Sequence, residues 1–161
     1  MSEKTIRTLY EAFARLDGDA MADCYVEQAC FDDEVFSLRG RREVGGMWRM
    51  LCENVRAKGM ADWKFEVRDI HAHDGHGSAH WEATYRFSAT GRLVHNAIDA
   101  KMAFDGGGLI VSHRDRFDFW RWSREALGAP GLLLGWTPLL RRKVRSQAAA
   151  NLQRFLAGTA R

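Results

Sequence analysis

Several polar side chains occupy positions where the alternation of the sequence calls for apolar ones. Asp115 follows the register of Val111 and Phe117, and His113 lies two positions before it on the same face. At roughly 3.3 Å per residue, these two side chains would lie about 7 Å apart along a strand, so one bound molecule could touch both. A buried carboxylate either pairs with another group or has a raised pKa, because an isolated buried charge is costly. In an apolar cavity, such a carboxylate can act as a general acid or base near neutral pH.

The same reasoning selects a second acid, Asp33, which shares a face with Phe31 and Val35 if that segment is extended. It also selects Tyr85 and Asn96, two polar residues in apolar registers. We predict Asp33 and Asp115 as the catalytic candidates. The predicted ligand-binding residues are mostly aromatic or apolar and comprise Phe31, Trp48, Trp63, Trp81, Tyr85, Asn96, Ile98, His113 and Phe117.

Each of these residues also has a purely structural interpretation. Asp115 could pair with an arginine or cap a backbone group, and a buried Asp–His pair could serve stability alone. Tyr85 could belong to the core and reach water with its hydroxyl. The set is more informative than its members, since polar groups that converge on one cavity point to a ligand.

Other groupings of polar residues are weaker signals. The histidine-rich segment 71–80, HAHDGHGSAH, could offer two imidazoles to a metal, but its glycines are typical of a hairpin turn, and we expect neither a metal nor another cofactor. The run RDRFDFWRWSRE mixes arginine and aromatic residues as single-stranded nucleic-acid binders do, yet strand alternation explains it equally well. The basic residues at 141–145 are interpreted as a solvated helix face, so no nucleic-acid partner is expected.

Length and composition favour a single domain spanning residues 1–161. The chain is 46% apolar and 28% charged, as in ordinary globular proteins. A chain of this size buries roughly 70% of its unfolded surface, so it needs no disulfide or metal for stability. Cys24, Cys30 and Cys52 are odd in number and lack metal or redox spacing, which predicts reduced, buried thiols.

The remaining composition signals concern location. The net charge is only +3, and the first residues, MSEKTIRTLYEAF, lack the apolar core of a secretory signal. The longest apolar stretch is too short to span a membrane. We therefore expect a cytoplasmic protein with no membrane span.

The periodicity of the chain changes once, from helical to alternating. Apolar residues at helical spacing predict helices over 6–16, 17–25 and 41–58, and a pair of glycines lies inside the third of them. Four alternating runs follow, separated by turn signals, and predict an antiparallel meander with strands at 63–68, 80–87, 97–104 and 111–119.

A loose, Gly-rich connection is expected at 127–135, followed by a last helix that begins at Thr137-Pro138. Helices followed by a meander indicate an α+β fold, in which a curved antiparallel sheet and the N-terminal helices enclose an apolar pocket. An extra helix at the C-terminus completes the prediction.

The order of these elements, together with the segments CFDDEVFSLRG and GLIVSHRDRFDFW, resembles the nuclear transport factor 2-like superfamily, and more closely its SnoaL-like branch. Ketosteroid isomerase and limonene epoxide hydrolase are relatives of that branch. The resemblance covers roughly residues 4–122 and leaves 123–161 as a C-terminal helical extension. It implies a cone-shaped fold, a deep pocket between sheet and helices, and a homodimer formed through the sheet.

The resemblance also suggests roles for single residues. Asp33 matches the general base of ketosteroid isomerase, with Glu34 where proline is common. Tyr10 is nearest to the oxyanion tyrosine of that enzyme, and Asp99 could match its protonated aspartate, although alternation places Asp99 opposite Asn96.

The segment HRDRFD at residues 113–118 matches WRDYFD of limonene epoxide hydrolase, in which Asp115 would be a catalytic carboxylate. The arginine and partner aspartate of that enzyme fall at Trp81 and Ala83 here. SnoaL cyclases use a pocket aspartate as acid and base, a role with which Asp115 is compatible.

Our first hypothesis is a cofactor-independent acid–base enzyme, an isomerase, cyclase or hydrolase, acting on a small hydrophobic molecule. Asp115 or Asp33 would move a proton, while Tyr85, Asn96 and His113 position the substrate. The alternatives are a non-catalytic binding module for a small molecule and a dimeric interaction domain whose cavity is filled by its own side chains.

Overall fold

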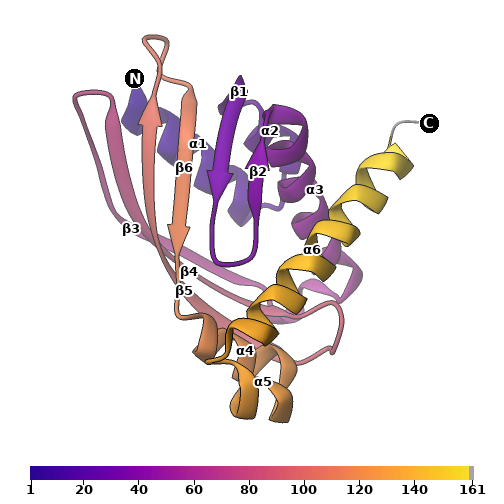
Figure 1. Cartoon of the computed structure of the whole chain (residues 1–161). Coiled ribbons are helices and arrows are strands. Elements are labelled where there is room, and N and C mark those ends of the chain that lie inside the picture. The colour runs from indigo at the N-terminus through magenta and orange to yellow at the C-terminus, as the bar shows by residue number, and fades with distance from the viewer. Residues whose placement is uncertain (160–161) are drawn as a thin grey trace.

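A computed structural model describes residues 1–159 of the chain, with a six-stranded sheet and helices on its inner side (Figure 1). The helices are α1 Ser2–Ala14, α2 Gly18–Ala22, α3 Arg41–Ala57, the short 3-10 helix η1 Met60–Asp62, α4 Phe119–Leu127, α5 Ala129–Leu134 and α6 Pro138–Thr159. The strands are β1 Tyr25–Asp32, β2 Ser37–Arg39, β3 Lys64–His73, β4 His76–Arg86, β5 Leu93–Phe104 and β6 Ile110–Arg116.

The sheet has the strand order β2-β1-β6-β5-β4-β3. The predicted α+β class and the antiparallel meander of β3 to β6 are confirmed. The expectation of a purely antiparallel sheet is wrong, because β1 pairs with β6 in parallel. Alternation shows which side chains share a face, but it carries no information about the direction of a long-range pairing.

The first helix is confirmed and buries Ile6, Leu9 and Phe13 among others. The second helix is shorter than predicted. Asp17 caps its start by accepting the backbone N–H of Ala20 at 3.0 Å, and the helix ends at Ala22. Tyr25, which was predicted to lie in this helix, is instead the first residue of β1.

The last strand is also shorter than predicted. β6 ends at Arg116, and the Asp118 carboxylate accepts the backbone N–H of Arg121 at 3.0 Å. Because Asp118 is thereby the N-cap of α4, Phe119 begins a helix and does not continue the strand. The segment 127–135, predicted as a loose connection, contains α5.

The two glycines of α3 permit close helix packing. A Cβ atom at Gly46 would collide with Leu156 of α6, and one at Gly45 would lie 2.8 Å from the Cβ atom of Ala22 in α2. Glycine lowers helix propensity, so this pair weakened the prediction of a helix over 41–58, which the structure confirms. The structure shows that the two glycines instead let α2 and α6 approach α3.

Helix α6 crosses the inner side of the curved sheet and lies against α3 (Figure 1). Leu152 and Leu156 of α6 are buried in the main core, together with Trp48 and Met47 of α3. A smaller core cluster is formed around Val94, Phe119 and Trp122. No helix within residues 1–159 combines the length and the apolar character needed to cross a bilayer.

Candidate functional site

A cavity of about 530 Å³ lies between the inner face of the sheet and helices α3 and α6. This volume is in the usual range for small-molecule sites. Asp33 and Asp115 both line it. The other predicted residues on its wall are Phe31, Trp48, Trp63, Trp81, Tyr85, Asn96, Ile98 and Phe117. The interior is therefore hollow, which argues against a domain filled by its own side chains.

Asp33 lies in the turn between β1 and β2, at the edge of the cavity. Its Oδ1 atom accepts the backbone N–H groups of Val35 at 2.6 Å and of Phe36 at 2.5 Å. Burial in the cavity wall raises the pKa of Asp33 to about 7, against the lowering effect of the two N–H groups; the nearby Asp115 and Glu34 carboxylates raise it further. The second oxygen of Asp33 has no hydrogen-bond partner within residues 1–159, so it can accept a proton from a bound molecule.

Asp115 is held by a chain of three buried side chains, His113, Tyr25 and Trp48. The Oδ1 atom of Asp115 lies 2.8 Å from Nε2 of His113, whose Nδ1 lies 2.7 Å from the hydroxyl of Tyr25. The indole N–H of Trp48 donates to that hydroxyl at 3.0 Å. An indole can only donate, so Tyr25 donates its own proton to Nδ1 and the Nε2–H group of His113 donates to Asp115. This assignment gives each nitrogen and hydroxyl of the chain a partner, and it leaves Oδ2 of Asp115 without a hydrogen bond within residues 1–159.

His113 was predicted to contact the ligand, but the structure places it one layer behind the cavity wall. It is 1% exposed and does not line the cavity. Strand parity correctly turned its side chain inward, whereas depth below the wall depends on the neighbouring rings of Phe31 and Trp48. His113 therefore orients Asp115, and Tyr25, which sequence reasoning placed in a helix, completes the support.

Two neutral donors face the same cavity. The Tyr85 hydroxyl accepts the indole N–H of Trp122 at 3.0 Å, which leaves its own proton available. Burial raises the pKa of Tyr85 to about 12, so the hydroxyl stays protonated at neutral pH. Asn96 is buried and lines the cavity, and its side-chain amide makes no hydrogen bond to other residues within 1–159. Such donors can bind a carbonyl oxygen and stabilise charge that develops on it.

A family model for the SnoaL-like domain matches residues 6–113. The chain belongs to the SnoaL-like family. Its fold is that of the nuclear transport factor 2-like superfamily, as the sequence suggested. A comparison with curated protein sequences found no significant match.

Solved structures share this fold at low sequence identity. A putative polyketide cyclase from Xanthomonas campestris pv. campestris has a TM-score of 0.58 and 18% identity over 77% of this chain and 95% of the other. An LEH-like epoxide hydrolase of M. tuberculosis also has a TM-score of 0.58 and 18% identity, over 82% and 92%. A hypothetical protein with a ketosteroid isomerase-like fold from Catenulispora acidiphila, in complex with trimethylamine, has a TM-score of 0.62. Its sequence identity is 12%, over 86% of this chain and 100% of the other.

Two residues that the resemblance to ketosteroid isomerase suggested do not reach the cavity of this SnoaL-like protein. Tyr10 is fully buried against Phe65 and Trp81, and burial raises its pKa. Asp99 lies on the outer face of the sheet, where its carboxylate lies 2.7 Å from Nδ1 of His80. Tyr85 and Asn96 are therefore the donors available to a ligand, since the indole nitrogen of Trp81 is fully buried.

The two acids also border a second, polar hollow. This cleft of about 420 Å³ is lined by Asp33, Asp115 and the arginines Arg114, Arg116 and Arg145, with Asp32 and Glu34 at its edge. Arg114 and Arg116 are exposed, so the cleft faces solvent. Asp33 and Asp115 thus lie between an apolar interior and a hydrated surface, and this position allows proton exchange with water.

No cluster of three or more His, Cys, Asp or Glu side chains within residues 1–159 has an arrangement that could hold a metal ion. The histidine-rich segment forms the β3–β4 hairpin, with His73 paired to His76 across the turn. The three cysteines are free thiols, and burial raises the pKa of Cys24 to about 11 and that of Cys52 to about 12.

Proposed function

We propose that this SnoaL-like protein is a cofactor-independent acid–base enzyme that moves a proton on a small hydrophobic molecule with a carbonyl group. One observation carries the proposal. Asp33, with a pKa raised to about 7, shares the wall of an aromatic cavity with a second carboxylate, Asp115, whose orientation is fixed. An acid whose pKa lies near the working pH is suited both to take up and to return a proton.

The reaction that suits this geometry begins with Asp33 as the base. Its second oxygen takes a proton from a carbon next to the carbonyl group, and the electron pair moves to the carbonyl oxygen. The Tyr85 hydroxyl and the Asn96 amide donate hydrogen bonds to that oxygen as its charge grows. Asp33 then returns the proton to the same or another carbon, so no cofactor is consumed. Asp115 accepts a hydrogen bond from a hydroxyl group of the substrate. Its negative charge also helps to keep the pKa of Asp33 high.

The related structures agree with a proton-transfer role but share only the fold. Their printed names include a cyclase, an epoxide hydrolase and an isomerase-like fold. Trp81 and Ala83 stand where the resemblance to limonene epoxide hydrolase expects an arginine and an aspartate. Both residues line the cavity, and neither carries a charge that could activate water. We therefore favour isomerase- or cyclase-type chemistry over epoxide opening.

Exchange of carbon-bound protons with deuterated water tests the proposal directly. A panel of cyclic ketones is incubated with the wild type, and proton loss next to the carbonyl is followed by NMR. Asp33→Asn should lower the exchange rate at least about 100-fold, because the amide cannot act as a base. Ketone affinity, measured by quenching of tryptophan fluorescence, should stay close to that of the wild type.

Asp99→Asn is the matched control, since it makes the same change on the outer face of the sheet. It should exchange protons as the wild type does. If the wild type binds ketones but exchanges them no faster than Asp33→Asn, the cavity is a binding module. The use of Asp33 Oδ1 to cap the turn at Val35 and Phe36 is the observation that favours this alternative. A homodimer through the sheet stays a prediction under either function.

A further inference from the structure

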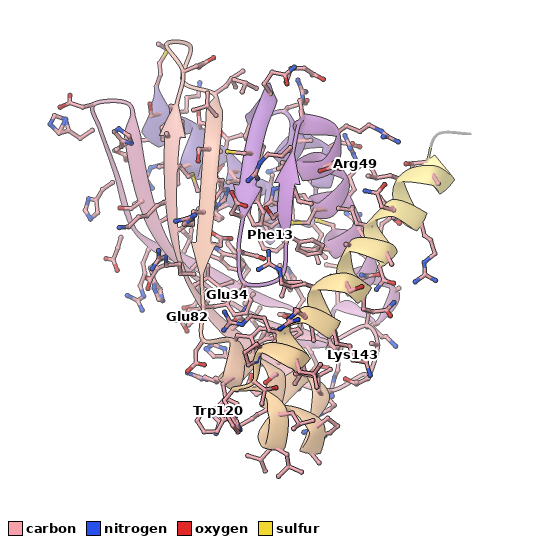
Figure 2. All side chains as sticks on the ribbon, in the orientation of Figure 1. Phe13, Glu34, Arg49, Glu82, Trp120 and Lys143 are labelled. Atoms are coloured by element: carbon pink, nitrogen blue, oxygen red, sulfur yellow. The ribbon has the colours of Figure 1, made fainter. Side chains whose placement is uncertain are left out.

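Most of the exposed large apolar side chains within residues 1–159 gather at one end. The apolar tip, as we name it, consists of five residues in α5, the turn after it and the start of α6: Leu132, Leu133, Leu134, Trp136 and Leu139. Trp136 is 72% exposed, Leu139 70% and Leu133 67%. Figure 1 shows α5 at the lower end of the molecule, and Figure 2 labels Trp120, itself half-exposed, beside it. Contiguous apolar surface of this kind marks an interaction site in most proteins.

The elements that carry the tip are strongly basic. Between Phe119 and Thr159 there are seven Arg or Lys residues and a single acid, Glu125. The whole chain has 24 basic and 21 acidic residues, so the remainder has 17 and 20 and is slightly acidic. The positive charge of the protein is therefore concentrated around its apolar end.

Most of this charge is available to a partner. Arg141 pairs with Glu34 at 2.8 Å, and the guanidinium of Arg124 stacks over the ring of Trp120. Arg142 is exposed and makes no ion pair within residues 1–159, and Lys143 extends from α6 at the wall of the cavity (Figure 2). Exposed leucines with a tryptophan, flanked by arginine and lysine, match the two layers of a lipid surface, acyl chains and charged headgroups.

We propose that the apolar tip docks on membrane surfaces that contain anionic lipid. Leu133, Leu139 and Trp136 would enter the boundary between headgroups and acyl chains, and Arg142 would contact lipid phosphates. The tip lies next to the cavity, because Pro130 of α5 and Leu140 of α6 line it. An apolar ligand could thus pass between bilayer and cavity with little exposure to water.

A second copy of the chain fits this surface less well. A two-fold interface would bring the same basic elements of both copies together, and like charges would repel. The one acid available to compensate, Glu125, already accepts the backbone N–H of His95 and lies 3.6 Å from Arg121. The charge pattern therefore favours an anionic lipid surface over self-association.

Flotation with vesicles tests the proposal on the full chain. Vesicles of equal parts phosphatidylcholine and phosphatidylglycerol should carry the wild type upward, whereas pure phosphatidylcholine should carry much less. Leu133→Ser combined with Trp136→Ser should reduce binding at least about tenfold, and Arg142→Glu roughly tenfold. Leu109→Ser and Arg42→Glu make matched changes outside the tip and should bind as the wild type does.

The proposal is overturned if the wild type fails to float with the anionic vesicles, or if the tip variants bind them as well as the controls do. Sedimentation equilibrium measures the alternative: a wild-type dimer that the Leu133→Ser, Trp136→Ser variant splits, without vesicle binding, would make the tip an interface between copies. Circular dichroism confirms that each variant is folded. These residues lie outside the cavity wall, so the proton-exchange assay stays independent of this outcome.

Discussion

Each face of the sheet carries a His–Asp pair, and the two pairs have almost the same separation. On the inner face, Nε2 of His113 lies 2.8 Å from Asp115, and both side chains are nearly inaccessible, at 0% and 2%. On the outer face, Nδ1 of His80 lies 2.7 Å from Asp99, whose side chain is 78% exposed. The distance between the partners is therefore a poor guide to what a pair does. Solvation decides whether it is a structural and chemical element or a surface contact of small energy.

The carboxylates on the two faces differ in the same way. On the outer face, Glu82 contacts Arg68, His80 and His95, and these hydrogen bonds lower its pKa. On the inner face, burial raises the pKa of Asp33 to about 7. Glu82 on the outer face is thus held in its ionised form. Asp33 at the cavity is close to half-titrated at neutral pH.

The largest difference in stability between the two faces is expected when the histidine of each pair is replaced. His113→Phe keeps a ring but removes both nitrogen atoms, which leaves Asp115 buried without a partner and the Tyr25 hydroxyl proton without its acceptor. The free energy of unfolding should fall by about 3–5 kcal/mol, as for other broken buried pairs. His80→Phe, the matched change on the outer face, should cost less than about 1 kcal/mol. Urea denaturation measures both; equal losses would show that solvation does not separate the two pairs.

A smaller effect is expected from the titration of Asp33. Its pKa in the folded state, about 7, lies above the unfolded value of about 3.9. The folded state therefore holds the proton more tightly, and this contribution to stability is lost as the pH rises toward 7 and above. Asp33→Asn cannot titrate and keeps an acceptor for the backbone of Val35 and Phe36.

The wild type should lose about 1–3 kcal/mol of unfolding free energy relative to Asp33→Asn as the pH rises from 5 to 8. Urea denaturation at both pH values gives the difference, and Asp99→Asn should follow the wild-type profile. A constant difference between Asp33→Asn and the wild type at the two pH values would contradict the raised pKa, and with it the contrast between the faces.

The third test concerns the helix that covers the inner face. Gly46→Ala places a methyl group against Leu156 and should destabilise the protein by about 1–3 kcal/mol, because α6 has to shift. Gly158→Ala makes the same change at the end of α6, where no atom lies within 4 Å, and should change stability by less than about 1 kcal/mol. Urea denaturation of the two variants distinguishes close packing from helix propensity.

Much of the scaffold could be predicted from the sequence, since local patterns determine it. Helical spacing located α1 and α3, and alternation located β3 to β5. Local patterns failed where capping or pairing decides the outcome. Asp118 ends the last strand by capping α4, and the parallel pairing of β1 with β6 joins segments far apart in the chain.

The candidate site was predictable to the level of direction but not of depth. Parity turned Asp115, Tyr85 and Asn96 inward, and all three line the cavity. Asp33 also lines it, but from the turn after β1 and not from an extended segment. Parity also turned His113 inward but could not show that aromatic rings cover it. The contributions of α6 and Trp122 to the cavity were missed because the long-range packing of a C-terminal extension leaves no periodic signal in the strands.

The parallel pairing of β1 with β6 has a consequence for how the protein reaches its native state. Tyr25 and His113, which meet through it, are 88 positions apart in the chain. The meander can form from neighbouring hairpins, whereas β1 has to find β6 across a long loop and at a correspondingly high entropic cost. Both candidate catalytic acids depend on this step, so the site is completed only when β1 has paired with β6, and the meander alone has no site.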